Sequence, residues 1–124
     1  MNPAYRVIRF TTEKPVPFPN FSVVTAFNPF GKVVEDEINE REDRKLYGAI
    51  LDLGEKPIQI TGMSHDGSHW EHGWTVLDAD SAVTLGKQFH QEAIYRIEEG
   101  TLLLVDLSSG HTEDLGQWSD HLLD

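Results

Sequence analysis

The chain has 124 residues, a net charge of −11 from 21 acidic and 10 basic residues, and no cysteine. This length predicts one domain, and a hydrophobic content of 39% is sufficient for a core. Without cysteine the protein has no disulfide bonds and no thiolate metal sites. Direct nucleic-acid binding is not expected, because it needs clustered lysine and arginine.

The sequence predicts neither membrane insertion nor export. No apolar run approaches the roughly 20 residues that cross a bilayer. The first ten residues, MNPAYRVIRF, lack the basic segment and long apolar core of a signal peptide. We therefore expect a cytoplasmic protein. Its acidity serves either solubility or docking on a basic partner.

The first half of the chain predicts a strand, a stiff connector, a central strand and a long helix. Tyr5–Phe10 is a short strand, and residues 11–20 contain three alternating prolines that favour an extended connector. Phe21–Asn28 is apolar on both sides, as in a central strand, and Pro29 ends it. Residues 33–53 place apolar side chains at helical spacing opposite a charged face.

The second half predicts two hairpins with a helix between them. The first hairpin runs from Lys56 to Leu77 around an Asp-Gly turn in residues 65–68. A helix follows to about His90 and is capped by Asp78 or Asp80. The remaining segments are two strands, 93–97 and 101–107, and a polar acidic tail, 108–124.

These elements predict an α+β fold. The order strand, helix, strand, strand, helix, strand is that of the ferredoxin-like split βαβ sandwich, a largely antiparallel sheet with two helices on one face. A mixed α+β sheet of different strand order is the alternative. The single domain, 1–124, would have its core in residues 21–107. An exposed edge strand allows a homodimer as well as a monomer.

A first group of polar residues lies near the end of the central strand. Asn28 ends that strand, and Asn39 and Asp43 are one turn apart on the following helix. They form either an Asx turn with exposed helix residues or a polar pocket at the end of the strand, where ligands often bind in open sheets. Gln91, between the second helix and the next strand, either satisfies backbone groups at the helix end or orients a ligand.

A second group is the segment from Ser64 to His72, which holds three histidines and two carboxylates in nine residues. His65, His69 and His72 are candidate ligands for a divalent metal. In an extended arm His69 and Glu71 share one face, whereas His72 points to the other. A turn of this composition is more often solvated, and the sequence indicates no cofactor.

No catalytic motif is present. The chain has no nucleophile elbow, no P-loop and no GxGxxG sequence. The sequence therefore offers no positive evidence for an enzyme.

The stretches FSVVTAFNP, GSHWEHGW and LGKQFHQEAIY resemble a bacterial family known as domain of unknown function 3293. The resemblance spans roughly residues 21–105. Asp43 stands where the family has a second asparagine, and His72-Gly73 replaces its usual pair. Because the family has no established activity, the resemblance implies kinship without function. The matching positions are Thr25, Asn28, Pro29, Asn39, Trp70, Glu71, Gly86, Phe89, Gln91 and Ala93.

Three functional hypotheses follow. The first is a domain that binds a small molecule or nucleotide in a polar pocket near Asn28, through Asn28, Asn39, Glu71 and Gln91. The second is a protein-interaction or regulatory domain that acts through its acidic surface. The third is a metal-binding protein that uses the segment from His65 to His72.

Overall fold

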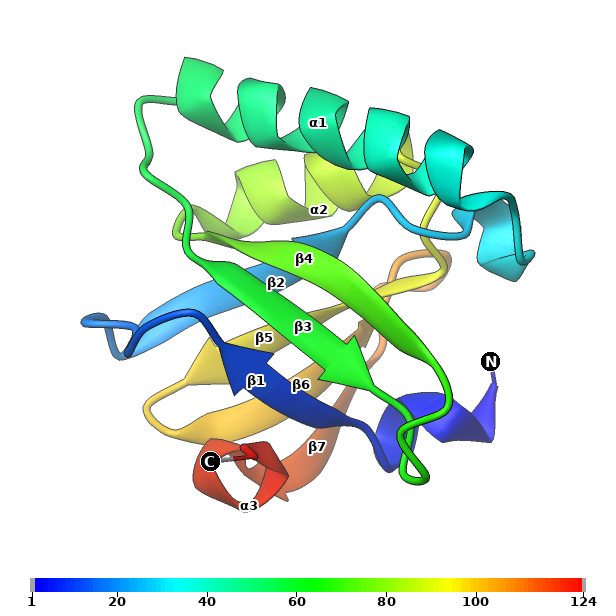
Figure 1. The fold of residues 1–124 in the computed structure, drawn as a ribbon. Coiled ribbons are helices and arrows are strands. Elements are labelled where there is room, and N and C mark those ends of the chain that lie inside the picture. The colour runs from blue at the N-terminus through cyan, green and yellow to red at the C-terminus, as the bar shows by residue number, and fades with distance from the viewer. Residues whose placement is uncertain (1, 124) are drawn as a thin grey trace.

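The computed structural model describes residues 2–123. Within them, one sheet of seven strands has the order β1-β3-β4-β2-β5-β6-β7, and all neighbouring strands are antiparallel (Figure 1). The strands are β1 (Arg9–Thr12), β2 (Asn20–Thr25), β3 (Gln59–Met63), β4 (Trp70–Val76), β5 (Ala93–Glu98), β6 (Thr101–Asp106) and β7 (Thr112–Gln117).

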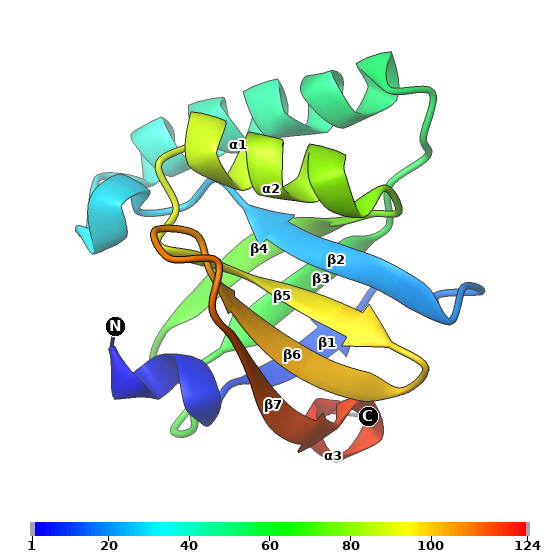
Figure 2. The ribbon, with the colours of Figure 1, turned by 180° about the vertical axis from the view of Figure 1, so that it is seen from behind.

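Two helices, α1 (Asp36–Asp52) and α2 (Ala79–Gln88), cover the convex face of this sheet (Figure 2). The predicted capping by Asp78 is confirmed, since its carboxylate accepts a hydrogen bond from the Ser81 backbone N–H at 2.9 Å. No helix within residues 2–123 combines the length and apolarity that a bilayer crossing requires. The shorter helical segments are η1 (Pro3–Arg6), η2 (Pro29–Gly31) and α3 (Trp118–His121).

The sheet curls into a half-barrel, so that strands far apart in its order come together. The ring of Phe10 in β1 lies 5.1 Å from that of Tyr95 in β5, although three strands separate them in the sheet. At the open side, the imidazole of His121 lies 2.9 Å from the carbonyl oxygen of Ile8 and 3.0 Å from that of Leu115. The chain end thereby links the two edge regions of the sheet.

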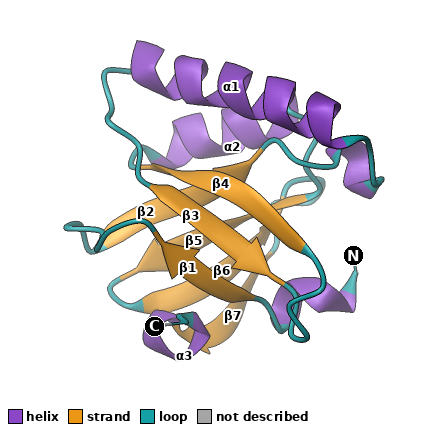
Figure 3. Cartoon of the chain, viewed as in Figure 1, coloured by secondary structure: helices purple, strands orange, loops and turns teal. Residues whose placement is uncertain are grey.

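The predicted ferredoxin-like sandwich is wrong. The strands form one continuous sheet (Figure 3), and this sheet is a curled half-barrel of seven strands with a second core inside the curl. Strand β7 lies in the segment expected to be a polar tail. Its sequence TEDLGQ lacks apolar alternation, because it is an outer edge strand that half-buries only Glu113 and Leu115. The first strand also begins later than expected, at Arg9, because η1 occupies residues 3–6.

The two sides of the sheet carry separate cores. In β2, Val24 faces α1 and α2 and is fully buried, whereas Phe21 and Val23 face the inside of the curl. One end of the curl is closed by Trp118 of α3, whose ring lies 5.0 Å from that of Phe10. The other end, beside η1 and the end of β2, is less completely filled.

Candidate functional site

Asn28 and Asn39 join the end of β2 to helix α1. Asn28 adopts a left-handed conformation, with φ 49° and ψ 63°. Its backbone N–H donates to Asn39 Oδ1 at 2.8 Å, and Asn39 Nδ2 donates back to Asn28 Oδ1 at 3.0 Å. Both residues are buried, with 8% and 6% of their surface exposed. Since buried amides need partners, each asparagine holds the other in place.

Glu71 of β4 joins this pair from the inside of the curl. Asn28 Nδ2 donates to Glu71 Oε2 at 2.9 Å, and His69 Nε2 lies 3.0 Å from the same oxygen. As the strand alternation predicts, His69 and Glu71 share a face. His72 instead contacts Thr61 Oγ1 at 2.8 Å and the ring of Phe27. Asn28 thus connects a helix residue to a carboxylate on the sheet.

Gln91 lies just after α2 and serves a structural role. Its Nε2 donates to the carbonyl oxygen of Phe27 at 3.0 Å and to that of Phe89 at 3.2 Å. This amide therefore ties the end of α2 to the residue before Asn28. The predicted site residues therefore lie together at this end of the sheet: hydrogen bonds join Asn28 to Asn39 and Glu71, and Gln91 bonds to the backbone of the residue before Asn28.

A cavity of about 250 Å³ opens beside this cluster, on the concave face. Asn28, Glu71 and Gln91 line it, whereas Asn39 lies behind Asn28 and supports it. A narrower space of about 50 Å³ shares Glu71 and Gln91 and extends toward Tyr95. The remaining wall of the larger space is mostly apolar or small: Asn2, Ala4, Tyr5, Ile8, Phe27, Gly31, Val33, Gly62, Met63, Ser64 and His69.

Two tyrosines beside the cavity indicate its electrostatic character. Burial, and to a smaller extent the carboxylates of Glu92 and Glu71, raises the pKa of Tyr5 to about 12. Burial also raises the pKa of Tyr95, with smaller contributions from Tyr5 and Glu71. The Tyr95 hydroxyl donates to the carbonyl oxygen of Tyr5 at 2.7 Å. A negative charge is therefore disfavoured in this part of the molecule.

The backbone next to Asn28 adopts several unusual conformations. Asn28, Phe30 and His90 have φ values of 49°, 60° and 58°, a region that non-glycine residues rarely occupy. Gly31 has φ 69°, and a Cβ there would overlap the carboxylate of Glu92 unless that flexible side chain moved. Such conformations are concentrated at functional sites. The positions of these residues therefore indicate a candidate site at this end of the sheet, independently of the cavity.

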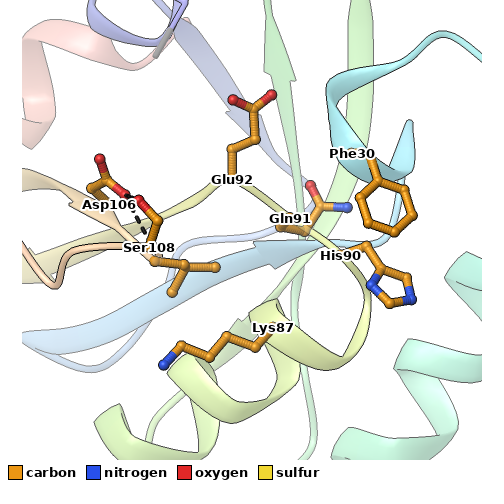
Figure 4. Close-up of a pocket in the computed structure, with 8 residues that line it drawn as sticks. Phe30, Lys87, His90, Gln91, Glu92, Asp106 and Ser108 are labelled. Atoms are coloured by element: carbon orange, nitrogen blue, oxygen red, sulfur yellow. Dashed lines mark hydrogen bonds between the residues drawn. The ribbon is translucent and has the colours of Figure 1, made fainter.

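A second, shallower cavity of about 450 Å³ lies beyond Gln91 (Figure 4). The rings of Phe30 and His90 stack there, with centroids 4.4 Å apart. Lys87 shares this cavity with acidic side chains, including Asp106, which is held by a hydrogen bond from the Ser108 hydroxyl at 2.7 Å. Charges of both signs line the cavity, so they do not favour one ligand charge.

The structure does not assemble a metal site from the predicted histidines. His65 lies in an exposed turn, His69 contacts Glu71, and His72 faces the other side of β4. Within residues 2–123, no group of three or more histidine or acidic side chains is arranged to hold a metal ion. Asp43 does not line the cavity, and it accepts a hydrogen bond from Trp74 Nε1 at 2.9 Å.

Sequence reasoning missed three residues of this region, Tyr5, Tyr95 and Glu92. Tyr5 and Tyr95 are 90 residues apart and meet only because the sheet curls. Glu92 directly follows Gln91 in the chain, and its carboxylate lies beside Gly31 in space. That glycine was the only sequence signal for a close backbone approach. A glycine after an Asn-Pro step indicates a turn in any case, so that signal was not specific.

Comparison with known proteins identifies a family but no characterised relative. The family model described as a protein of unknown function (DUF3293) matches residues 24–94. This range is more than half of the chain and contains all four predicted site residues. Searches of curated proteins and of solved structures found no match.

Proposed function

The chain belongs to the family described as a protein of unknown function (DUF3293), and we propose that it binds a small organic molecule in the concave cavity between Asn28, Glu71 and Gln91. Because the family membership names no activity, the proposal rests on the geometry. The main support is the convergence of three polar side chains from separate elements on one mostly apolar space. Binding sites for small molecules commonly combine apolar walls with a few fixed polar groups.

The cavity size favours a small molecule over a nucleotide. A volume of 250 Å³ equals the liquid volume of about eight water molecules. A ligand of similar size, with an apolar body, would displace this water and contact side chains such as Ile8, Phe27 and Met63. Release of water from apolar surface would then contribute to binding.

The polar residues divide into supporting and ligand-facing groups. Asn28 and Asn39 use their amides mainly on each other and on neighbouring groups, which fixes the cavity wall. Glu71 and Gln91 each keep one side-chain oxygen, Oε1, without a hydrogen-bond partner among residues 2–123. These two oxygens are the atoms that we assign to ligand contact.

A fragment screen by two-dimensional NMR on ¹⁵N-labelled protein tests this proposal. Binding fragments should shift the amide signals of residues such as Asn28, Gly62 and Gln91. The variant Gly62→Leu places a side chain in the cavity, since a Cβ at Gly62 would lie 2.8 Å from the flexible tip of Ile8. We expect at least tenfold weaker binding to this variant.

The matched control is Gly48→Leu, because a Cβ at Gly48 on α1 meets no atom within 4 Å. It should bind fragments as the wild type does. Shifts that cluster elsewhere on the wild-type protein would contradict the proposal. So would unchanged affinity in a Gly62→Leu variant whose spectrum remains dispersed. If that variant does not fold, the location of the wild-type shifts decides.

A further inference from the structure

The two side-chain oxygens that we assign to ligand contact, Oε1 of Glu71 and Oε1 of Gln91, are both hydrogen-bond acceptors. Both amide hydrogens of Gln91 are engaged by backbone carbonyls, which leaves its Oε1 free. Glu71 uses Oε2 for its contacts with Asn28 and His69, which leaves Oε1 free among residues 2–123. A carboxylate accepts hydrogen bonds and donates none. A ligand group that contacts these two oxygens therefore supplies donors.

The charge of the cavity also favours a ligand that donates hydrogen bonds. The Glu71 side chain is only 27% exposed, so water screens its charge incompletely. None of the described residues that line the cavity is a lysine or an arginine. The raised pKa of Tyr5, caused by burial and then by Glu92 and Glu71, is consistent with a negative potential there. A carboxylate or phosphate ligand would meet the same repulsion.

The apolar wall includes aromatic rings. Tyr5 and Phe27 both line the space that Glu71 enters. The face of an aromatic ring attracts a cation within about 6 Å, and this attraction increases when water is excluded. A cationic group near Glu71 would therefore gain from the carboxylate and from the rings, whereas a neutral donor would gain mainly a hydrogen bond.

Building on the proposed function, we propose that the cavity selects a small amine: a protonated ammonium group held by Glu71 Oε1 and Gln91 Oε1, carried on an apolar body that packs against Tyr5 and Phe27. Glu71 acts as the counter-ion. Asn28 holds this carboxylate in position, and Asn39 holds Asn28. The sequential support explains why two buried asparagines lie behind a single acidic group.

Three probes that each carry a phenyl ring on a short alkyl chain test the charge preference: phenethylammonium, 2-phenylethanol and phenylacetate. Each is titrated at pH 7 and low salt, and the shifts of cavity amides give the dissociation constant. We expect phenethylammonium to bind at least tenfold more tightly than 2-phenylethanol, and phenylacetate to bind most weakly. This comparison uses the wild-type protein and so does not depend on the folding of a variant.

The variant Glu71→Gln should bring the affinities for phenethylammonium and 2-phenylethanol within about a factor of two of each other. Its matched control is Glu37→Gln, which removes one negative charge from an exposed position on α1 and should leave the wild-type preference intact. Equal loss of preference in both variants would assign the effect to the overall charge of the protein, which overturns the role of Glu71.

The outcomes separate this inference from the proposed function. If 2-phenylethanol or phenylacetate shifts the cavity amides at the same concentration as phenethylammonium, the cavity binds small molecules but does not select amines, and the inference is wrong. If none of the three probes shifts the cavity amides, and the fragment screen also finds no cavity ligand, the proposed function itself fails.

Discussion

The two faces of the curled sheet differ in how completely they are covered. The convex face is packed by two helices, and Leu46 and Ile50 of α1 are fully buried against it. The helical cover of the concave face consists of short segments, α3 at one end and η1 at the other (Figure 1). In this protein the two long helices fill the space above the convex face, whereas the short segments leave a cavity between side chains on the concave face.

Strand β4 shows this difference at neighbouring positions. Trp74 and Val76 point to the helices and belong to the convex core. Glu71 and Gly73 point into the curl and line its cavities. At Gly73 a Cβ would lie 2.9 Å from the carbonyl oxygen of Val24, so the close strand packing requires glycine there. One strand thus provides a dry core on one side and a polar, accessible group on the other.

The largest expected effect contrasts the two faces directly. Leu46→Ala on the convex side removes a fully buried side chain and should lower the free energy of unfolding by about 3 kcal/mol. Ile8→Ala borders the concave cavity, where part of the side chain is already unpacked, and should cost about 1 kcal/mol. Urea unfolding of both variants measures the difference. Equal losses would show that the concave side is as tightly packed as the convex side.

The next effect concerns the polar link between the faces. Asn39→Ala removes the acceptor of the buried Asn28 N–H and the donor to Asn28 Oδ1, so it should lower the free energy of unfolding by about 2 kcal/mol. Asn20→Ala is the control, because Asn20 bonds to Glu99 at an exposed position and its loss should cost less than about 0.5 kcal/mol. A similarly small loss of unfolding free energy for Asn39→Ala would mean that Asn39 does not hold Asn28 in place.

Alkaline pH should destabilise the concave side through Tyr5. Its pKa is about 12 in the folded protein, because of burial and then of Glu92 and Glu71, compared with a usual value near 10. The unfolded chain therefore loses this proton first as the pH rises. The stabilisation is complete below pH 10 and declines as the pH rises toward 12. Between pH 9 and pH 11 the unfolding midpoint should fall further for the wild type than for Tyr5→Phe. An equal fall in the two proteins would contradict this assignment.

The smallest effect is expected at the rim of the cavity. His69 contacts Glu71 at 3.0 Å, but the imidazole side chain is 53% exposed. Exposed ion pairs contribute little, so His69→Ala should change the free energy of unfolding by less than about 0.5 kcal/mol. Lys45→Ala, which breaks the exposed pair with Glu42 on α1, provides a matched comparison on the convex side. A loss well above 1 kcal/mol only for His69→Ala would show that the imidazole is part of the buried network.

Local sequence pattern was sufficient for most individual elements. The helix expected in residues 33–53 is present as α1, and the hairpin after Lys56 is present as β3 and β4. Residues that stand out as polar within apolar blocks also meet in space: Asn28, Asn39 and Glu71 are joined by hydrogen bonds. Periodicity sets which side chains share a face, and the ends of adjacent strands lie close together, so both results follow from short-range rules.

Only the tertiary structure revealed the curl and the cavity inside it. The curl depends on contacts between distant segments, such as Phe10 with Tyr95 and His121 with both Ile8 and Leu115. These contacts leave no periodic signal, because each involves single residues separated by many positions along the chain. Strand twist and side-chain volume determine how far a sheet curls, and the balance is reached only when all seven strands are assembled.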